Sequence, residues 1–429
     1  QTYERVIGAR PKASKSVVKS ESKKLLYRIK RKIHSVMAEP MVGQREQVIF
    51  VCVHNLDVED RIVKLRCFEK IDQELKHLGW KIVVIHHSDF KLDTTLEVVD
   101  FKKHKPSIKS TLEFQKLFSK DKSFVESVHF LHGFHNSLQR MKTWRDDVLQ
   151  VKKESIQFYD LIKTHKPFLC VLWHEWNSYA HMNARISKHF EVPYMYAHEG
   201  FLSGTLGIDP CGEMAESLPA VDEDFNSLRI SDKDRETTRT FLKYLSDNSL
   251  DRKMQIEAGS VRNLIEKTKK DYSAVVFYAG VNDWQTGMLP TWWDKANQHS
   301  EFYVDSYDAL VDLVKVCEEK NWLCLFKPHP NVPPSNRIPK SENLIFLRHA
   351  NILELIQQSD VCVTLLSTVS YQAMTHGTPV AILGRNSLSP SGAAYQLEAA
   401  AELGDLVEAA IKRENFDDKN KAWVDHVSR

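Results

Sequence analysis

Short apolar runs that alternate with helix-like segments constrain the fold of this chain more than any other feature. In the first half, runs that are apolar at nearly every position lie at 47–54, 80–87, 168–174 and 192–198. A helical pattern over 57–78 separates the first two runs, and one over 177–189 separates the last two. Such runs are typical of strands in a parallel sheet that helices cover on both faces, so this half predicts an α/β unit. The stretch 95–160 is mostly helical in pattern, with a strand-like run at 127–134.

A second series of the same kind follows a polar helical region at 231–270. Its strand-like runs lie at 273–280, 322–330, 343–349, 360–367 and 378–384, and its helical patterns at 305–319, 351–358, 369–376 and 394–412. With 429 residues, the chain is long enough for two domains of about 150–200 residues each. We therefore expect an N-terminal domain over 43–260 and a C-terminal domain over 261–429. Both should be Rossmann-like α/β domains that face each other across a cleft.

Composition and charge exclude several classes of protein. A hydrophobic content of 42% and a charged content of 27% are ordinary for a globular chain. The net charge of +2 argues against a protein that binds nucleic acid through bulk charge. No apolar run approaches the ~18–20 residues that cross a bilayer, and no signal peptide is visible. The seven cysteines are odd in number and lack a CxxC pair, which predicts free thiols in a reducing, cytoplasmic compartment.

Residues 1–42 form a strongly basic N-terminal segment. Between Arg10 and Lys32 it contains eight further basic residues and a single acid, Glu21. Apolar residues recur through it at helical spacing, at Val18, Leu25, Leu26, Ile29, Ile33 and Val36. A cationic helix with one apolar stripe over 10–37 can lie on an anionic inner-membrane surface. The alternative is a linker helix that packs on a neighbouring domain.

Polar groups follow three of the predicted strands in the second domain. They are Lys327, His329 and Pro330 of the sequence KPHP, Ser367 and Thr368 before a helix, and Gly280 and Asn282 of the sequence AGVND. Ligands of open parallel sheets bind outside the carboxyl ends of the strands. A cation, an imidazole, two hydroxyls at a helix N-terminus and a glycine that admits close approach together predict a phosphate site. The alternative is that Ser367 only caps its helix and that KPHP is only a rigid turn.

Two predicted strand ends of the first domain carry histidine and glutamate. His174 and Glu175 end one run, and His198 and Glu199 end the next. Carboxylates at such a place suit acid/base work at a glycosidic centre. The alternative is that both histidines are buried and serve packing. We expect no metal and no cofactor, because no DxD motif stands in a suitable place and these groups lack a chelating spacing.

The KPHP sequence and the segment 367–384 resemble the nucleotide-binding half of capsule-polysaccharide and related GT-B glycosyltransferases. In that family a His-Pro motif and a Ser/Thr pair hold the phosphate of a CMP-activated sugar. The resemblance implies this role for His329 and its neighbours, and a GT-B-like fold. Gln372 stands where the family usually has an acidic residue.

A second segment, EGFLSGTLGIDPCGEMAESLP at 199–219, is similar to retaining bacterial β-Kdo transferases. These enzymes build the Kdo linkers or caps of capsules, O-antigens and related lipopolysaccharides. The match implies CMP-Kdo as donor and makes Asp209 a candidate nucleophile, in a loop flanked by glycine and proline. Glu175 and Glu199 are rival carboxylates, and Asp283 of the second domain is a further one. The alternative for Asp209 is a turn residue before proline.

The leading hypothesis is therefore a GT-B-like transferase that moves Kdo from CMP-Kdo, with retention, to a bacterial surface glycan or glycolipid. It would be cytoplasmic and peripheral to the inner membrane. One alternative keeps the fold and uses another CMP- or UDP-sugar. Another is a catalytically inactive module that binds nucleotides or glycans.

Overall fold

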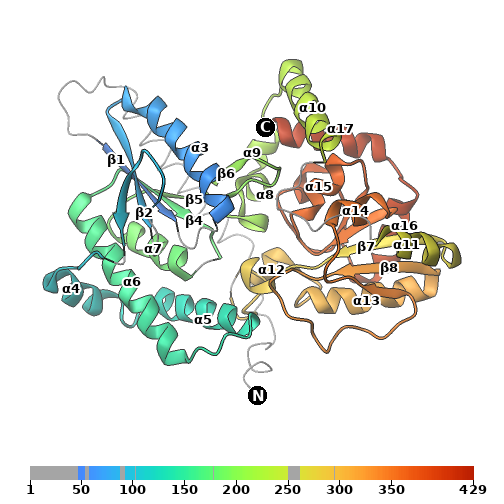
Figure 1. The fold of residues 1–429 in the computed structure, drawn as a ribbon, viewed down its shortest axis with the longest axis horizontal. Helices are drawn as coiled ribbons and strands as arrows, with labels where there is room; N and C mark the ends of the chain where they lie inside the picture. Colours follow the sequence, from blue (N-terminus) through green and yellow to red (C-terminus); the bar gives the residue numbers. More distant parts are fainter. Residues whose placement is uncertain are drawn as a thin grey trace. The chain divides into compact units, whose positions relative to one another are not determined.

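The computed structural model describes residues 47–53, 58–86, 92–101, 103–176, 178–249, 261–293 and 295–429, without the side chains of 58–64. The described chain forms two compact units, each an α/β structure (Figure 1). The basic N-terminal segment over 1–42, with its expected helix over 10–37, lies outside the described residues.

The first unit is built on a six-stranded sheet in the order β3-β2-β1-β4-β5-β6. Its strands are β1 (Gln47–Val53), β2 (Trp80–His86), β3 (Glu97–Asp100), β4 (Leu169–Trp173), β5 (Tyr194–Glu199) and β6 (Leu206–Asp209). Neighbouring strands are parallel except β6, which runs antiparallel to β5. This is the strand order of a doubly wound Rossmann sheet, in which the winding direction reverses between β1 and β4.

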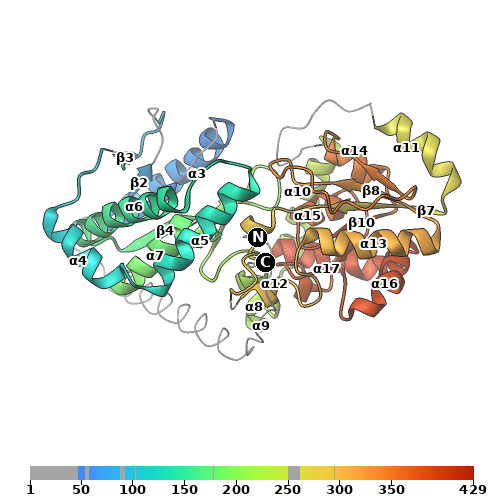
Figure 2. The ribbon, with the colours of Figure 1, turned by 90° about the horizontal axis from the view of Figure 1, so that it is seen from below.

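Helices cover both faces of the first sheet (Figure 2). They are α3 (Val58–Lys76), α4 (Ile108–Phe118), α5 (Lys122–Ser137), α6 (Trp144–His165) and α7 (Ser178–His189). Phe68 of α3 packs on one face with Val51 and Val84, whereas Phe50 and Cys52 face the core under α5, α6 and α7. Because successive side chains of a strand point to opposite faces, a strand buried on both faces is apolar at nearly every position. This explains why the predicted runs show no polar alternation.

The region 95–160 differs from the expectation at one place. The run at 127–134, expected to be strand-like, lies inside helix α5. Phe124, Val128 and Leu131 of that helix are buried at three- and four-residue spacing. A short apolar run does not by itself distinguish a strand from a buried helix segment, and here the helical period prevails. The short strands β3 and β6 were not predicted, because each has four residues and is buried only in part.

The second unit contains a six-stranded sheet in the order β12-β11-β10-β7-β8-β9. Its strands are β7 (Ala274–Ala279), β8 (Trp322–Lys327), β9 (Leu344–Phe346), β10 (Val361–Thr364), β11 (Val380–Ile382) and β12 (Tyr395–Gln396). All neighbouring strands are parallel. Counted from β7, this is again the Rossmann order, with the reversal between β7 and β10. The prediction of two Rossmann-like α/β units is confirmed.

Helices lie on both faces of the second sheet as well (Figure 2). The helices of this unit are α8 (Leu218–Val221), α9 (Glu223–Asn226), α10 (Asp232–Asp247), α11 (Arg262–Thr268), α12 (Ala296–His299), α13 (Ser306–Lys320), α14 (Ile352–Gln357), α15 (Val369–Thr375), α16 (Leu403–Ile411) and α17 (Phe416–Ser428). Leu313 of α13 and Val407 of α16 belong to one core with Phe326. Leu355 of α14 and Trp423 of α17 belong to the core on the other face.

The chain passes into the second unit earlier than position 260, where the sequence analysis places the boundary. Residues 201–203, and the described residues from Met214 onward, belong to the second unit. Helix α10 is held there by an ion pair of 2.7 Å between Arg235 and Asp425 of α17. The sequence pattern of α10 does not show which unit it packs on, because its partner α17 lies far away in the sequence.

The helix expected over 394–412 is instead two elements. Tyr395 and Gln396 form the edge strand β12, which pairs with β11. The Gln396 side-chain amide donates to the carbonyl of Gly384 at 2.6 Å, and α16 begins only at Leu403. Pairing with a neighbouring strand overrides the local helical pattern.

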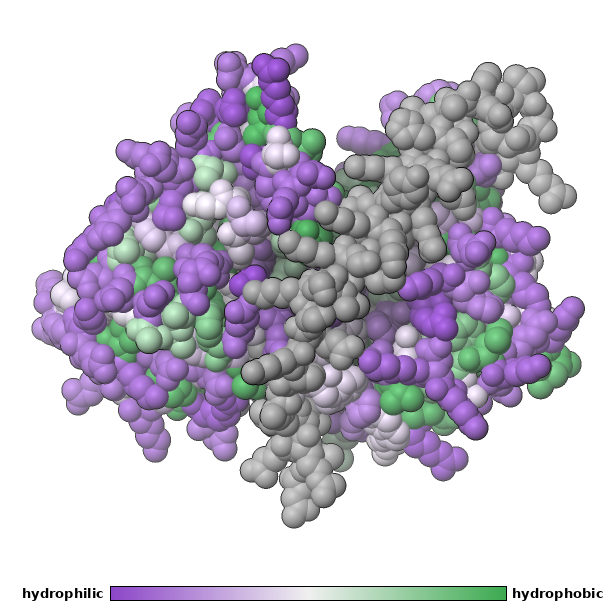
Figure 3. All heavy atoms as spheres, turned by 180° about the vertical axis from the view of Figure 1, so that it is seen from behind, coloured by the Kyte–Doolittle hydropathy of each residue, from purple (hydrophilic) through white to green (hydrophobic). Residues whose placement is uncertain are grey.

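No helix among the described residues is long and apolar enough to cross a membrane. On the face drawn in Figure 3, hydrophobic side chains lie in small separate groups among hydrophilic ones. Exposed apolar side chains such as those of Ile108 and Leu112 are ordinary on protein surfaces.

The buried His426 of α17 makes the stability of the second unit depend on pH. Its Nε2 accepts a hydrogen bond from the Tyr371 hydroxyl at 2.9 Å. Burial, helped by the charge of Arg429, lowers the pKa of His426 to about 4. The unfolded chain binds this proton near the ordinary pKa of about 6.5, so stability is full above that pH and decreases as the pH falls toward 4. We expect a loss of roughly 3 kcal/mol by urea denaturation.

The matched control for this prediction is His426→Gln. Its side-chain oxygen can still accept from Tyr371, but it does not titrate. Between about pH 7 and 4.5 this variant should lose less stability than the wild type. Parallel losses in the two proteins would contradict the role given to His426.

Candidate functional site

The predicted site residues fall at the carboxyl edges of the two sheets. In the first unit, His174 and Glu175 directly follow β4, beside the reversal between β1 and β4. In the second unit, β10, β7 and β8 are neighbours in that order. The residues at the carboxyl ends of these three strands are therefore grouped around the reversal between β7 and β10. Ligands of Rossmann-like sheets bind at such a reversal, so both edges are candidate binding sites.

His174 and Glu213 form a histidine–carboxylate pair in the first unit. The Nδ1 atom of His174 lies 3.3 Å from Oε1 of Glu213. His174 has a positive φ of 56°, and its backbone N–H donates to the carbonyl of Ala197 at 2.9 Å. Because a left-handed backbone is unfavourable for a residue with a side chain, the neighbouring structure must stabilise it here.

Glu175 and Glu213 are joined by two reciprocal hydrogen bonds. The backbone N–H of Glu175 donates to Oε1 of Glu213 at 2.8 Å, and the backbone N–H of Glu213 donates to Oε2 of Glu175 at 2.7 Å. Both side chains are buried. The pair ties the end of β4 to the loop that follows β6. A carboxyl group of Glu175 is therefore part of the scaffold of this site.

Glu213 carries a negative charge at neutral pH. Burial alone would raise its pKa, but the charges of His174 and His198 and the hydrogen bonds to its oxygens lower the pKa to about 2. Glu213 is thus a buried anion, and the histidines that act on it are His174, which follows β4, and His198, near the end of β5. Glu213 was not assigned from the sequence. The sequence signal that could have found Glu213 is its place inside the segment 199–219. This segment contains several acidic residues and does not by itself show which of them is buried.

His198 and Glu199 end β5, as predicted. The buried His198 ring bonds through Nδ1 to the carbonyl of Glu199 at 2.6 Å. The ring lies against Gly207 of β6, where a β-carbon would approach its Cε1 atom to 2.3 Å. Gly207 is therefore required by the ring of His198. The alternative, that His198 is buried and serves packing, agrees with this arrangement, and catalytic roles for His198 and Glu199 stay predictions.

Asp209 ends β6, and its side chain shapes the loop that follows. Its Oδ1 accepts hydrogen bonds from the backbone N–H groups of Cys211 at 2.7 Å and Gly212 at 3.1 Å. This is the turn-forming role that the sequence analysis gives as the alternative. The side chain is buried, with 8% of the residue exposed. The role of nucleophile stays a prediction.

Lys327 ends β8 in the second unit, and His329 and Pro330 follow it. The carbonyl of Lys327 accepts from the N–H of Gly280 at 2.9 Å, which joins this turn to the end of β7. The Nδ1 atom of His329 accepts from the N–H of Asn331 at 3.3 Å. A β-carbon at Gly280 would lie 3.1 Å from Cα of Pro328. Gly280 therefore packs closely against the KPHP turn, whereas the sequence analysis assigns it to ligand approach.

Ser367 and Thr368 lie between β10 and α15. The Ser367 hydroxyl accepts from the N–H of Val369 at 3.3 Å, and the Ser367 N–H donates to the hydroxyl of Thr364 at 2.9 Å. Ser367 is thus in part a cap of α15, as its alternative states. Ser367 and Thr368 are both partly exposed at the carboxyl edge. The ends of β8 and β10 are two strand spacings apart, roughly 10 Å.

Asn282 and Asp283, which follow β7, serve the structure of the loop. Asn282 is buried and caps the turn at Trp284. Asp283 accepts from the N–H of Ser306 at 2.9 Å. Burial, with the neighbouring carboxylate of Asp305, raises the pKa of Asp283 above its ordinary range. These contacts give Asn282 a structural role, and contact of Asn282 with a nucleotide stays a prediction.

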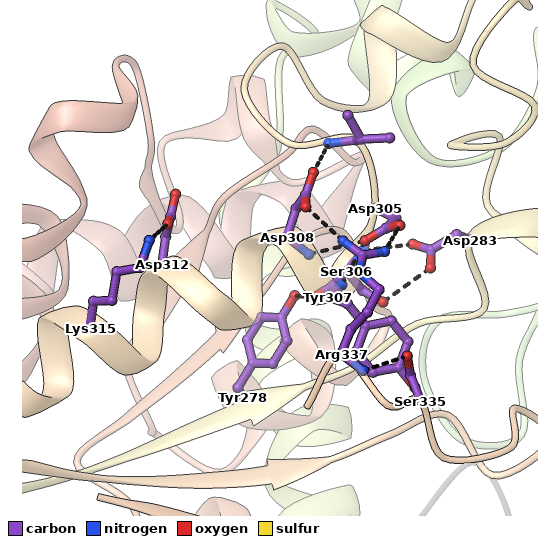
Figure 4. A network of polar contacts seen from close by, with 11 residues as sticks. Tyr278, Asp283, Asp305, Ser306, Tyr307, Asp308, Asp312, Lys315, Ser335 and Arg337 are labelled. Carbon is purple, nitrogen blue, oxygen red and sulfur yellow. Dashed lines mark hydrogen bonds and ion pairs between the residues drawn. The ribbon is translucent and has the colours of Figure 1, made fainter. Parts of the chain in front are cut away.

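The same network fixes the loop that follows the KPHP turn (Figure 4). The guanidinium of Arg337 contacts Asp305 and, at 2.6 Å, Asp308, both at the start of α13. It also lies over the ring of Tyr307, 5.9 Å from the ring centroid. Arg337 therefore anchors the chain between His329 and β9.

Among the described residues, no group of three or more histidine, cysteine, aspartate or glutamate side chains is arranged to hold a metal ion. In the first unit, the structure brings His174, Glu175, His198 and Glu213 together at one edge. In the second unit it places the cation, the imidazole and the hydroxyls on strands that flank β7.

No protein-family model matches the sequence, and no curated protein matches it. Among solved structures, the beta Kdo 2,4 transferase of Thermosulfurimonas dismutans KpsC is 16% identical, with 57% of this chain and 79% of that chain covered and a TM-score of 0.42. The S. aureus MnaA–UDP co-structure is 10% identical, with 88% and 91% covered and a TM-score of 0.39. The UDP-GlcNAc 2-epimerase of Methanocaldococcus jannaschii, in complex with UDP-GlcNAc and UDP, is 11% identical, with 87% and 98% covered and a TM-score of 0.39. Likenesses of this size carry no argument about activity.

Proposed function

We propose that this chain is a glycosyltransferase that moves a sugar from a nucleotide-activated donor to a glycan or glycolipid. The observation that carries the proposal is the grouping of Lys327, His329 and the Ser367–Thr368 pair. They follow strands on either side of β7, at the edge where Rossmann-like sheets bind ligands. Two hydroxyls, a cation and an imidazole are suited to the charged oxygens of a phosphate.

The donor that we propose is CMP-Kdo, with transfer that retains the configuration at the anomeric carbon. The support is the resemblance of 199–219 to retaining β-Kdo transferases, together with that of 367–384 to the part of related GT-B glycosyltransferases that binds a CMP-activated sugar. A screen of sugar donors with the purified chain tests this assignment. Release of CMP from CMP-Kdo supports it, and release of UDP from a UDP-sugar assigns the chain to another donor. Binding of CMP without turnover of any donor would instead identify a nucleotide-binding module.

His329→Ala is expected to weaken CMP binding by roughly 1.5–3 kcal/mol, because a hydrogen bond to a charged oxygen is lost. Ser367→Ala should act in the same direction with a smaller effect, because its hydroxyl is a neutral donor. Isothermal titration calorimetry with CMP measures both.

The matched control is His349→Ala. His349 is an exposed histidine of the same unit, beyond the edge strand β9. Because His329 also accepts from Asn331, thermal unfolding must show that the His329 variant keeps its fold. Unchanged CMP affinity in both the His329 and Ser367 variants would refute the phosphate site.

We also propose that the basic segment 10–37 contacts the anionic inner-membrane surface. Deletion of residues 1–37 should leave turnover of a soluble acceptor analogue intact and lower binding to vesicles that contain phosphatidylglycerol. Each basic residue near such a surface contributes about 1 kcal/mol. Equal vesicle binding by both forms would favour the alternative, a linker helix.

A further inference from the structure

His174 lies beside the reversal between β1 and β4 in the first sheet, and its side chain is partly exposed to solvent. Its side chain is 38% exposed, whereas the neighbouring His198 is 5% exposed. The Nδ1 atom of His174 faces the carboxylate of Glu213. The Nε2 atom has no hydrogen-bond partner among the described residues, so the side that points away from Glu213 is open to a ligand.

The backbone of His174 is held in an unfavourable conformation. Its φ of 56° lies in the left-handed region, which side chains other than those of asparagine and aspartate adopt at a cost. The N–H of His174 donates to Ala197 on β5, and the next N–H, that of Glu175, donates to Glu213. Strain that the surroundings stabilise in this way is concentrated at functional sites.

The charge on Glu213 determines which nitrogen of the imidazole carries the proton. The N–H of Glu175 donates to Oε1 of Glu213 at 2.8 Å and the ring of His174 lies 3.3 Å from the same oxygen, and these hydrogen bonds favour the ionised form of Glu213. An anion cannot donate, so Nδ1 of His174 must be the protonated atom of the pair. In the neutral ring the lone pair is then on Nε2, the exposed side. This is the arrangement in which a buried carboxylate orients a histidine as a general base.

The other polar groups of this edge are engaged in the scaffold. Oε2 of Glu175 accepts from the backbone of Glu213, and Oδ1 of Asp209 accepts from two backbone amides. The His198 ring is bonded to the carbonyl of Glu199. His174 therefore differs from its neighbours in having an accessible basic atom.

We infer that His174 is the general base of sugar transfer and that Glu213 is the residue that positions it. The inference rests on the proposed function. The acceptor hydroxyl gives its proton to Nε2 of His174 as its oxygen forms a bond to the anomeric carbon. In the retaining reaction the acceptor attacks the sugar–enzyme ester, so the bond from that carbon to the ester oxygen breaks and its electron pair stays with the carboxylate that is released. Glu213 stabilises the imidazolium that is formed.

His174→Asn is the variant that separates chemistry from folding, because asparagine tolerates the left-handed backbone. It should lower kcat about 10²–10⁴-fold with little change in CMP affinity, which is the scale of general base catalysis. His174→Gly also suits this backbone and leaves space for a free base. Added imidazole should restore part of its kcat. A His174→Asn enzyme with nearly normal kcat, or a His174→Gly enzyme that imidazole does not rescue, would overturn the role.

Glu213→Gln tests the positioning role against a matched control. Glu126→Gln makes the same change in another histidine–glutamate pair of this unit, in which His181 lies 3.2 Å from Glu126. Nitrogen NMR of labelled histidines, with His174 assigned by its loss in His174→Asn, reports which nitrogen is protonated. We expect the Nδ1-protonated form in the wild type and in Glu126→Gln, and loss of this preference in Glu213→Gln.

The two measurements separate failure of this inference from failure of the proposed function. If the wild type turns over no sugar donor, the proposed function fails, and the role of general base fails with it. If donors are turned over but His174 is protonated at Nε2, the orientation by Glu213 is wrong although the function stands. Turnover together with the Nδ1-protonated form and imidazole rescue supports both.

Discussion

Asp209→Asn is expected to abolish sugar transfer while the fold and CMP binding are retained. The Asn side chain keeps an oxygen that can accept from the backbone N–H groups of Cys211 and Gly212, as Oδ1 of Asp209 does at 2.7 and 3.1 Å. The loop after β6 should therefore persist. An amide is not a nucleophile, so a retaining reaction through a covalent sugar–enzyme ester should slow at least about 10³-fold.

The direct measurement is intact-mass spectrometry of the wild type with donor alone. It should show an adduct of one sugar on the peptide that contains Asp209, and no adduct in Asp209→Asn. Circular dichroism and CMP titration serve as controls for folding and donor binding. Nearly normal turnover in the variant would reject the nucleophile role and leave Asp209 as a turn residue. An adduct on Glu175 or Glu199 would transfer the role to that carboxylate.

Phe326→Ala is expected to destabilise the second unit by about 3–5 kcal/mol. Phe326 is 1% exposed and precedes the KPHP turn on β8. Its ring lies 5.7 Å from that of Tyr278 and 6.1 Å from that of Tyr307. Truncation leaves a cavity under the turn that carries Lys327. A loss of this size is a large part of the about 5–15 kcal/mol that stabilises a typical protein.

Phe346→Ala provides the matched control, because Phe346 pairs with Phe326 in register on β9 but is 37% exposed. Its truncation should cost much less. Since a chain with two units need not unfold in one step, hydrogen exchange with mass spectrometry should follow peptides from β7 and β8 separately. Similar losses in the two variants would show that burial of Phe326 is not the main source of stability there.

The predicted strands were found where burial on both faces leaves a local signature. The run that ends at Phe326 is such a case, because its neighbours alternate between the two cores of the second unit and all of them are apolar. The prediction of a strand at 127–134 was wrong, because a segment of a buried helix has the same local composition. β12 was missed because its two residues are defined by pairing with β11 and not by their own pattern.

For the candidate site, the sequence identified the strand ends but not the partners. His174, Glu175 and His198 were recognisable because polar residues directly follow apolar runs. The contact between Glu213 and His174, which lie 39 positions apart in the chain, was not recognisable, since no local pattern encodes it. Gly280 and Asn282 were expected at a ligand; the structure adds contacts within the chain for both, and their roles at a ligand stay predictions.

The sequence by itself therefore determined the elements whose signal is local: the parallel strands, the number of sheets and the edge at which polar side chains gather. Tertiary structure alone decided the order of the strands, the early passage of the chain into the second unit at Met214, and the pairing of His174 with Glu213. The physical reason is that burial of a strand depends on its own side chains, whereas a hydrogen bond between distant residues depends on how the whole sheet brings their backbones together.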